Sequence, residues 1–255
     1  MMTGSVDGLF DVAGKTVLVT GGGSGIGGFM ATALAEAGAR LVLVGRRPEP
    51  LAAVLAAAGG NGVAIPLDLG AAGAAQDLAA QCASHSVSPD IIVNAAGVNP
   101  RQHANDISEE EWVATVHLNL NVPFLVAQAF VPAMRQRGWG RIVNIASLQT
   151  TRAFENGIAY GAAKGGIAQL TRAMAEAWSA DGIMANAIAP GFFPTELTAP
   201  VFGNPEVANM HASRTAIGRN GALTDLRGPL LFLASDASAY VTGQILAVDG
   251  GYTAK

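Results

Sequence analysis

Residues 16–27, TVLVTGGGSGIG, join a short apolar run rich in β-branched residues to a glycine-rich turn. The residues after the turn have helical character, so the stretch predicts a strand, a tight turn and the N-terminus of a helix. Glycine tolerates positive φ and lets the backbone approach a bound phosphate closely. The free N–H groups and the positive dipole end of the helix would face the same phosphate. The stretch therefore predicts a dinucleotide-binding turn in the first βαβ unit.

The same alternation of strand and helix continues along the chain. Six further apolar runs are continuous, as in strands buried on both faces, and span 41–44, 63–65, 90–94, 141–145, 184–188 and 244–248. Helical stretches rich in Ala and Leu lie at about 25–38, 49–58, 71–86, 108–137, 157–181 and 224–235. This alternation predicts an α/β fold of the Rossmann type, a doubly wound parallel sheet of about seven strands with helices on both faces.

The domain organisation follows from composition and from proline and glycine placement. Half of the 255 residues are hydrophobic and 13% are charged, which favours a large buried core over disorder. No Pro/Ser-rich linker or charge block interrupts the chain, so we expect residues 1–255 to form a single domain. The segment 192–222 is rich in proline and glycine and lacks a strand pattern, which predicts a substrate loop or lid.

Charge, cysteine and histidine content exclude several classes of protein. The formal net charge is −4 and no run of Lys or Arg occurs, which disfavours a nucleic-acid partner. Cys82 is the single cysteine and the four histidines form no close ligand pair, so we expect neither an internal disulfide nor a metal site. The first seven residues do not resemble a signal peptide, and no uncharged apolar run reaches the length of a membrane span. These features predict a cytoplasmic protein.

The end of the second predicted strand indicates the type of dinucleotide. An acidic residue at this point would accept hydrogen bonds from the adenosine ribose. This chain instead has glycine followed by Arg46 and Arg47. A guanidinium binds phosphate through several N–H donors, so the substitution favours NADP over NAD. The alternative interpretation is two solvated arginines at the start of a helix.

Tyr160 and Lys164 are four residues apart in a predicted helix and so share one face. A free tyrosine has a pKa near ~10, and a nearby cation stabilises the phenolate. Because general acid–base catalysis works best with a pKa near the operating pH, we expect Lys164 to lower the pKa of Tyr160 and to make it an acid/base. Either residue could instead belong to an ordinary helix surface.

Three other polar residues are candidates for the site, two of them at the edge where a parallel sheet places its ligands. Ser147 follows one strand and Asn94 ends another, so both lie at the carboxyl edge of the predicted sheet. A hydroxyl at that edge would donate to a substrate carbonyl oxygen as negative charge develops on it. Asn119 lies within a predicted helix although asparagine is a poor helix former, which indicates a bend or a site.

These motifs in this order resemble the short-chain dehydrogenase/reductase family, and the resemblance extends from about Leu9 to Tyr252. The matching elements are Thr20–Gly27, Asp68 with Leu69, Asn94–Gly97, Asn119, Ser147 with Tyr160 and Lys164, and Pro190-Gly191 followed by Thr195. Each element alone is weak evidence, but their joint spacing is specific. Gly182–Asn186 departs from the family, which more often has Arg-Val before the asparagine.

The resemblance implies a role for each matching residue. Tyr160 would transfer the proton, Ser147 would orient and polarise the substrate oxygen, and Lys164 would bind the nicotinamide ribose. Asn119 would hold a water that links Lys164 to solvent. With the residue patterns above, the predicted contacts of the NADP or NAD cofactor are Gly21, Ser24, Gly25, Ile26, Gly27, Arg46, Asp68, Leu69, Asn94, Ala95, Gly97, Tyr160, Lys164, Pro190, Gly191, Phe193 and Thr195.

Within the family, residues 9–15 and 195–198 resemble sugar-acid dehydrogenases of the gluconate 5-dehydrogenase type. The expected activity is hydride transfer between nicotinamide and a secondary alcohol or ketone, on a sugar acid or polyol. A 3-oxoacyl-carrier-protein reductase is an alternative, although Arg135, Arg137 and Arg141 are better interpreted as solvated helix-end charges than as a docking patch. A non-catalytic dinucleotide-binding regulator is a second alternative. The resemblance also implies a homotetramer.

Overall fold

The computed structural model describes residues 6–255 and contains one seven-stranded sheet in which every neighbouring pair is parallel. The strand order is β3-β2-β1-β4-β5-β6-β7. The strands are β1 (Thr16–Thr20), β2 (Arg40–Gly45), β3 (Gly62–Pro66), β4 (Ile91–Asn94), β5 (Gly140–Ile145), β6 (Ile183–Pro190) and β7 (Ile245–Val248). All seven predicted strands are confirmed. The prediction that the first seven residues are not a signal peptide falls mostly on residues 1–5, which lie outside the described residues.

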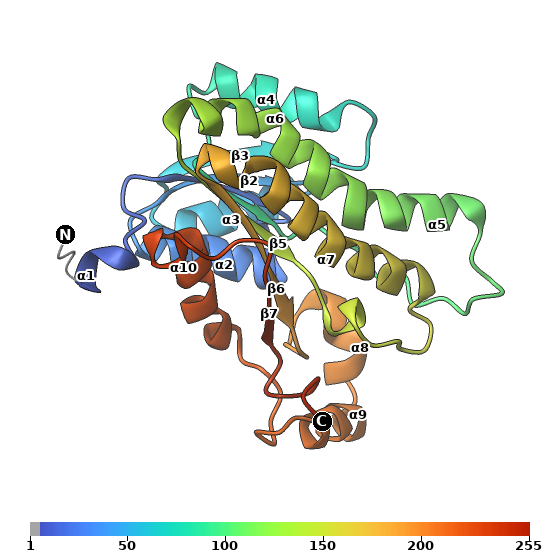
Figure 1. The fold of residues 1–255 in the computed structure, drawn as a ribbon. Coiled ribbons are helices and arrows are strands. Elements are labelled where there is room, and N and C mark those ends of the chain that lie inside the picture. The colour runs from blue at the N-terminus through green and yellow to red at the C-terminus, as the bar shows by residue number, and fades with distance from the viewer. Residues whose placement is uncertain (1–5) are drawn as a thin grey trace.

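Helices cover both faces of the sheet, as predicted (Figure 1). One face packs against α4 (Ala74–Ser84), α6 (Val122–Arg137) and α7 (Ile158–Trp178). The other packs against α2 (Gly25–Glu36), α3 (Pro48–Ala57) and α10 (Arg227–Ala234). Within β1, Val17 and Val19 belong to one buried cluster and Leu18 to the other, because successive side chains of a strand point to opposite faces. A sheet buried on both faces explains why its strands are continuous apolar runs.

The predicted helix 108–137 is interrupted in its middle. It consists of α5 (Glu109–Val116), a π-helical turn (His117–Asn121) and α6. Asn119 lies in this turn and is fully buried, which confirms the predicted irregularity. By length and composition the run Glu109–Arg137 could cross a membrane. Its apolar residues Val122, Val126 and Phe130 are buried against the sheet, so it packs as a core helix.

The segment 192–222 is more ordered than predicted. It contains α8 (Ala199–Phe202) and α9 (Pro205–Arg214), which lie beyond the carboxyl ends of the strands (Figure 1). The side chain of Asn204 accepts hydrogen bonds from the backbone N–H groups of Glu206 and Val207, and Pro205 occupies the first turn. These are helix-start features, so the proline here begins a helix and does not break one. The remaining short helices are α1 (Val6–Leu9) and the 3-10 turns 148–150, 179–181, 196–198, 223–226 and 236–238.

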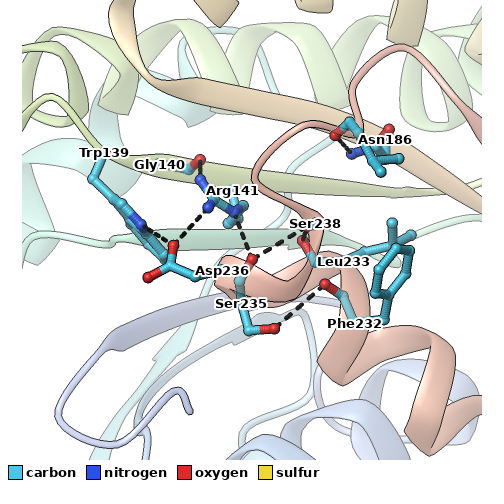
Figure 2. A network of polar contacts seen from close by, with 10 residues as sticks. Trp139, Gly140, Arg141, Asn186, Phe232, Leu233, Ser235, Asp236 and Ser238 are labelled. Atoms are coloured by element: carbon cyan, nitrogen blue, oxygen red, sulfur yellow. Dashed lines mark hydrogen bonds and ion pairs between the residues drawn. The ribbon is translucent and has the colours of Figure 1, made fainter. Parts of the chain in front are cut away.

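The expectation that Arg135, Arg137 and Arg141 are solvated is wrong for Arg141. This side chain is 2% exposed at the start of β5 and donates to the backbone oxygens of Ser235 and Gly140 and to the carboxylate of Asp236 (Figure 2). Asp236 also accepts from the indole N–H of Trp139, so the network joins the end of α10 to the sheet. A guanidinium is tolerated inside the protein here because its donors meet acceptors.

Candidate active site

A cleft of about 1250 Å³ runs along the carboxyl edge of the sheet. The strand order reverses direction between β1 and β4, and a doubly wound sheet binds its ligand at such a switch point. The cleft is lined by residues that follow β1, β2, β3, β4, β5 and β6 and by the segment 192–214. Every predicted cofactor contact except Asn94 lines this cleft.

The glycine-rich turn at the centre of the cleft has no room for side chains. Gly21 has φ +67, and a Cβ there would lie 2.9 Å from the backbone nitrogen of Ala96. A Cβ on Gly27 would collide with the carbonyl of Gly21. The hydroxyl of Thr20 accepts hydrogen bonds from the backbone N–H groups of Ala95 and Ala96, both 3.1 Å, and so fixes the turn against the loop after β4. The turn ends at the N-terminus of α2, which is the geometry of a pyrophosphate cradle.

Asn94 differs from the prediction. Its side chain is buried, and its amide nitrogen donates to Oδ1 of Asn144 at 2.9 Å and to the backbone oxygen of Pro123. Asn144 in turn donates to the hydroxyl of Thr171. The side chain of Asn94 therefore faces the core layer beneath the edge, and the cleft is lined by Ala95, Ala96 and Gly97 instead.

Tyr160 and Lys164 lie in the first turns of α7 and meet Ser147 at the end of β5. The ammonium of Lys164 is 5.5 Å from the ring centroid of Tyr160, and it donates to the backbone oxygen of Ile145 at 2.7 Å. Ser147 caps the short turn 148–150 by accepting from the backbone N–H of Gln149. The three predicted catalytic side chains thus line one cleft together with Asn119.

The electrostatics of this group differ from the prediction in one respect. Burial raises the pKa of the Tyr160 phenol above its ordinary value, while a hydrogen bond with Ser147 and the charge of Arg101 lower it in part. The pKa of the phenol is thus raised by burial and is not, as expected from the sequence, lowered by Lys164. Burial also lowers the pKa of Lys164 from 10.5 to about 8.

Asn119 is positioned by the π-helical turn. Its amide nitrogen donates to the backbone oxygens of Val98 and Thr115, both at 2.9 Å, whereas Oδ1 has no hydrogen-bond partner among the described residues. A Cβ on Gly97 would lie 2.6 Å from this Oδ1 and 3.9 Å from the ammonium of Lys164. The lack of a side chain on Gly97 therefore keeps open a small space that both polar groups face.

Arg46 and Asp68, which are expected at the adenosine end of the cofactor, line the cleft together with Arg47. The guanidinium of Arg47 lies 2.8 Å from the carboxylate of Glu196 and 3.3 Å from the hydroxyl of Ser24. Glu196 belongs to the predicted lid, so this ion pair connects the lid to the glycine-rich turn. The charge of Arg47 is offset in part by Glu196, and among the described residues Arg46 has no such carboxylate partner.

The opposite end of the cleft contains residues to which the sequence patterns assigned no role. They include Arg101, Arg152, Phe154, Phe192, His211, Arg214 and Tyr252. Phe192, His211 and Arg214 fall within 192–222, the predicted substrate loop or lid. The others fall outside this range, and no pattern in the sequence singles them out. We call this region the substrate end.

Comparison with known proteins agrees with this geometry. A family model described as "Enoyl-(Acyl carrier protein) reductase" matches residues 21–253. The 2-dehydro-3-deoxy-D-gluconate 5-dehydrogenase of Bacillus subtilis is 39% identical over 96% of this chain and 97% of its own length. Galactitol 2-dehydrogenase (L-tagatose-forming) of Cereibacter sphaeroides is 38% identical over 96% and 97%. The crystal structure of a gluconate 5-dehydrogenase from Burkholderia cenocepacia J2315 in complex with NADP and tartrate has a TM-score of 0.91 at 35% identity, covering 96% of this chain and 98% of that chain.

Proposed function

Because this chain belongs to the short-chain dehydrogenase/reductase family, we propose that it transfers a hydride between NADP and a secondary alcohol or ketone of a sugar acid or polyol. It is an NAD(P)-dependent oxidoreductase that acts on CH–OH groups. The observation that carries the proposal is the meeting of Tyr160, Ser147 and Lys164 in the cleft that also contains the glycine-rich turn.

The cleft fits a dinucleotide. The glycines of the turn bring bare backbone to the N-terminus of α2. A Cβ on Gly191 would come 2.9 Å from Cα of Asp249, so the close packing of residue 191 against residue 249, beside the cleft, also requires glycine. We propose that the turn and Thr195 bind the pyrophosphate, that Lys164 binds the nicotinamide ribose, and that Arg46 binds the 2′-phosphate. The NADP bound to the Burkholderia enzyme supports this choice of cofactor.

The proposed chemistry divides between cofactor and protein. Bound nicotinamide supplies or accepts the hydride. In reduction, Ser147 donates a hydrogen bond to the carbonyl oxygen and Tyr160 gives that oxygen its proton, so that the alcohol forms as the carbon receives the hydride. Burial raises the pKa of Tyr160, so the phenol is protonated and ready to donate at neutral pH. In oxidation Tyr160 accepts the proton, and the space shared by Asn119 and Lys164 is the proposed route of that proton to solvent.

The substrate class is drawn from the relatives. Sugar-acid and polyol dehydrogenases both resemble this chain over nearly its whole length, and the Burkholderia structure contains tartrate, a hydroxy acid. A 3-oxoacyl-carrier-protein reductase is the second candidate, favoured by the description of the matching family model. Against it, Arg135, Arg137 and Arg141 each pair with a carboxylate and form no free basic patch. The presence of all catalytic side chains disfavours a non-catalytic regulator.

We further propose a cytoplasmic homotetramer with one domain per chain and a lid at 192–222. Large apolar side chains are exposed on α5, α6 and β7, namely Trp112, Val113, Phe124 and Leu246. Family members commonly associate through the helices corresponding to 108–137 and 157–181 and through the C-terminal segment, and these exposed side chains lie on the first helix and on the last strand. Association would remove this apolar surface from water.

A turnover screen tests the proposed function. Aldonates, alditols and 3-oxoacyl thioesters are each offered with NADP and with NAD, and the nicotinamide absorbance is followed. We expect turnover of at least one aldonate or alditol with NADP. Turnover restricted to 3-oxoacyl thioesters would instead indicate a 3-oxoacyl-carrier-protein reductase. No turnover in any series would favour a non-catalytic dinucleotide-binding regulator.

A further inference from the structure

The substrate end of the cleft has an excess of positive charge. Arg101, Arg152, Arg214 and Lys255 all line it, against the single carboxylate of Glu155. Among the residues that the structure describes, none of these four cations is paired with an Asp or Glu carboxylate, whereas six other arginines are. Three of the four donate to backbone oxygens, Arg101 to Leu197, Arg152 to Thr253 and Lys255, and Lys255 to Thr215. Cations without a carboxylate partner that line a cleft raise its affinity for anions.

Arg214 is held at this end by buried aromatic residues. Its guanidinium donates to the phenol oxygen of Tyr252 at 3.4 Å, and the same oxygen lies 3.4 Å from Nδ1 of His211. The imidazole of His211 stacks on Phe192, with 3.7 Å between ring centroids. Tyr252 and His211 are each only 7% exposed. One of the five N–H donors of Arg214 is used in this way, and the others are available to a ligand.

The charge of Arg101 acts both on His211, beside Arg214, and on the phenol of Tyr160. Burial, together with the charges of Arg214 and Arg101, lowers the pKa of His211, so its ring is neutral at pH 7. The charge of Arg101 also acts on Tyr160. The charge of Arg101 therefore affects both Tyr160 and His211, and all three residues line the same cleft as Arg214. A ligand here would meet a neutral imidazole suited to hydroxyl groups and a guanidinium suited to a carboxylate.

We propose that Arg214, oriented by Tyr252 beside His211, binds a carboxylate of the substrate, so that the enzyme selects anionic hydroxy acids over neutral polyols. The inference rests on the proposed function and narrows it to one substrate class. A guanidinium and a carboxylate form paired, charge-assisted hydrogen bonds. A polyol with CH₂OH in place of the carboxylate leaves this charge without a partner, which is how a polar site rejects a neutral analogue.

The test compares matched pairs that differ only at one terminal carbon. D-gluconate and D-glucitol, D-xylonate and xylitol, and D-threonate and D-threitol are oxidised with NADP by the wild type and by Arg214→Gln. We expect the wild type to prefer the acids, and Arg214→Gln to lose about 10- to 100-fold in kcat/KM for the acids, mainly through KM, as for a lost charge-assisted hydrogen bond. The alditols should change little. Arg214→Lys keeps the positive charge but not the paired N–H donors of the guanidinium, so it should retain part of the preference for acids over alditols.

Two controls separate this role from a structural one. NADPH binding, measured by fluorescence, should be unchanged in Arg214→Gln and shows that the variant is folded. Arg40→Gln removes one positive charge at the opposite, amino edge of the sheet and should leave the acid preference intact. A wild type that prefers alditols, or an Arg214→Gln loss equal for acids and alditols, would overturn the subsite while leaving the proposed function standing. No turnover of either series would overturn the proposed function itself.

Discussion

The buried ammonium of Lys164 should make the stability of this protein depend on pH in a predictable direction. Lys164 is 5% exposed, and burial lowers its pKa from 10.5 to about 8. At about 1.36 kcal/mol per pKa unit, this lowering corresponds to about 3 kcal/mol. Between pH 8 and 10.5 the unfolded chain binds more protons than the folded one, so the free energy of unfolding rises with pH across this window. Below pH 8 the ammonium is charged in both states, and the folded protein carries the full free-energy cost of burying that charge.

The substitution Lys164→Met removes this titration. The variant also loses the hydrogen bond from Lys164 to the backbone oxygen of Ile145, which changes its free energy of unfolding by an amount that does not vary with pH. The difference in unfolding free energy between wild type and variant should therefore shift by about 3 kcal/mol in favour of the wild type from about pH 7 to about pH 10.5. Urea unfolding followed by tryptophan fluorescence, at one fixed protein concentration, measures the difference.

Lys255→Met, in an exposed position, controls for the loss of one charge. A difference between wild type and Lys164→Met that stays constant across the window would refute the reasoning, because it would mean that the ammonium of Lys164 is hydrated in the folded protein. A shift in the opposite direction would show that an interaction with its surroundings outweighs the burial.

Three further results are expected. Arg46→Asp should reverse a wild-type preference for NADP, measured as the ratio of kcat/KM values for the two cofactors; an unchanged ratio would remove Arg46 from the 2′-phosphate site. Amide hydrogen exchange in residues 192–222 should slow when cofactor and substrate are added together, because the lid closes over them; equal exchange with and without ligands would count against a lid. Light scattering should give four times the 25.8 kDa mass of the chain, and a monomer mass would rule out the tetramer.

The strands and most of the site could be predicted because their signals are local. Strands buried on both faces are continuous apolar runs, and the glycine-rich turn needs a fixed spacing of residues without side chains. Asn119 could be predicted because asparagine in the middle of a predicted helix conflicts with helix propensity, and the structure resolves that conflict with a π-helical turn.

The remaining features depend on three-dimensional surroundings. Asn94 ends a strand at the correct edge, but the alternation of side chains along that strand turns it toward Asn144. The pKa of Tyr160 is governed by burial, which its sequence neighbours do not reveal. Arg214 and Tyr252 meet from positions 38 residues apart, and no local pattern indicates such a pair. The helix α9 is not predicted by the sequence analysis, because the proline and glycine content of 192–222 indicates a loop.

The most direct test of the proposed mechanism is a comparison of Tyr160→Phe with the wild type in two measurements, the rate of hydride transfer and the binding of NADP. The substitution keeps the ring and removes the hydroxyl that exchanges the proton. The rate should fall by at least the ~10²–10⁴-fold typical of a lost general acid–base catalyst, while NADP binding should change little because the hydroxyl faces the substrate. Lys164→Ala, in contrast, should weaken both. A Tyr160→Phe enzyme that turns over at a near-normal rate would contradict the assignment of Tyr160 as the proton donor.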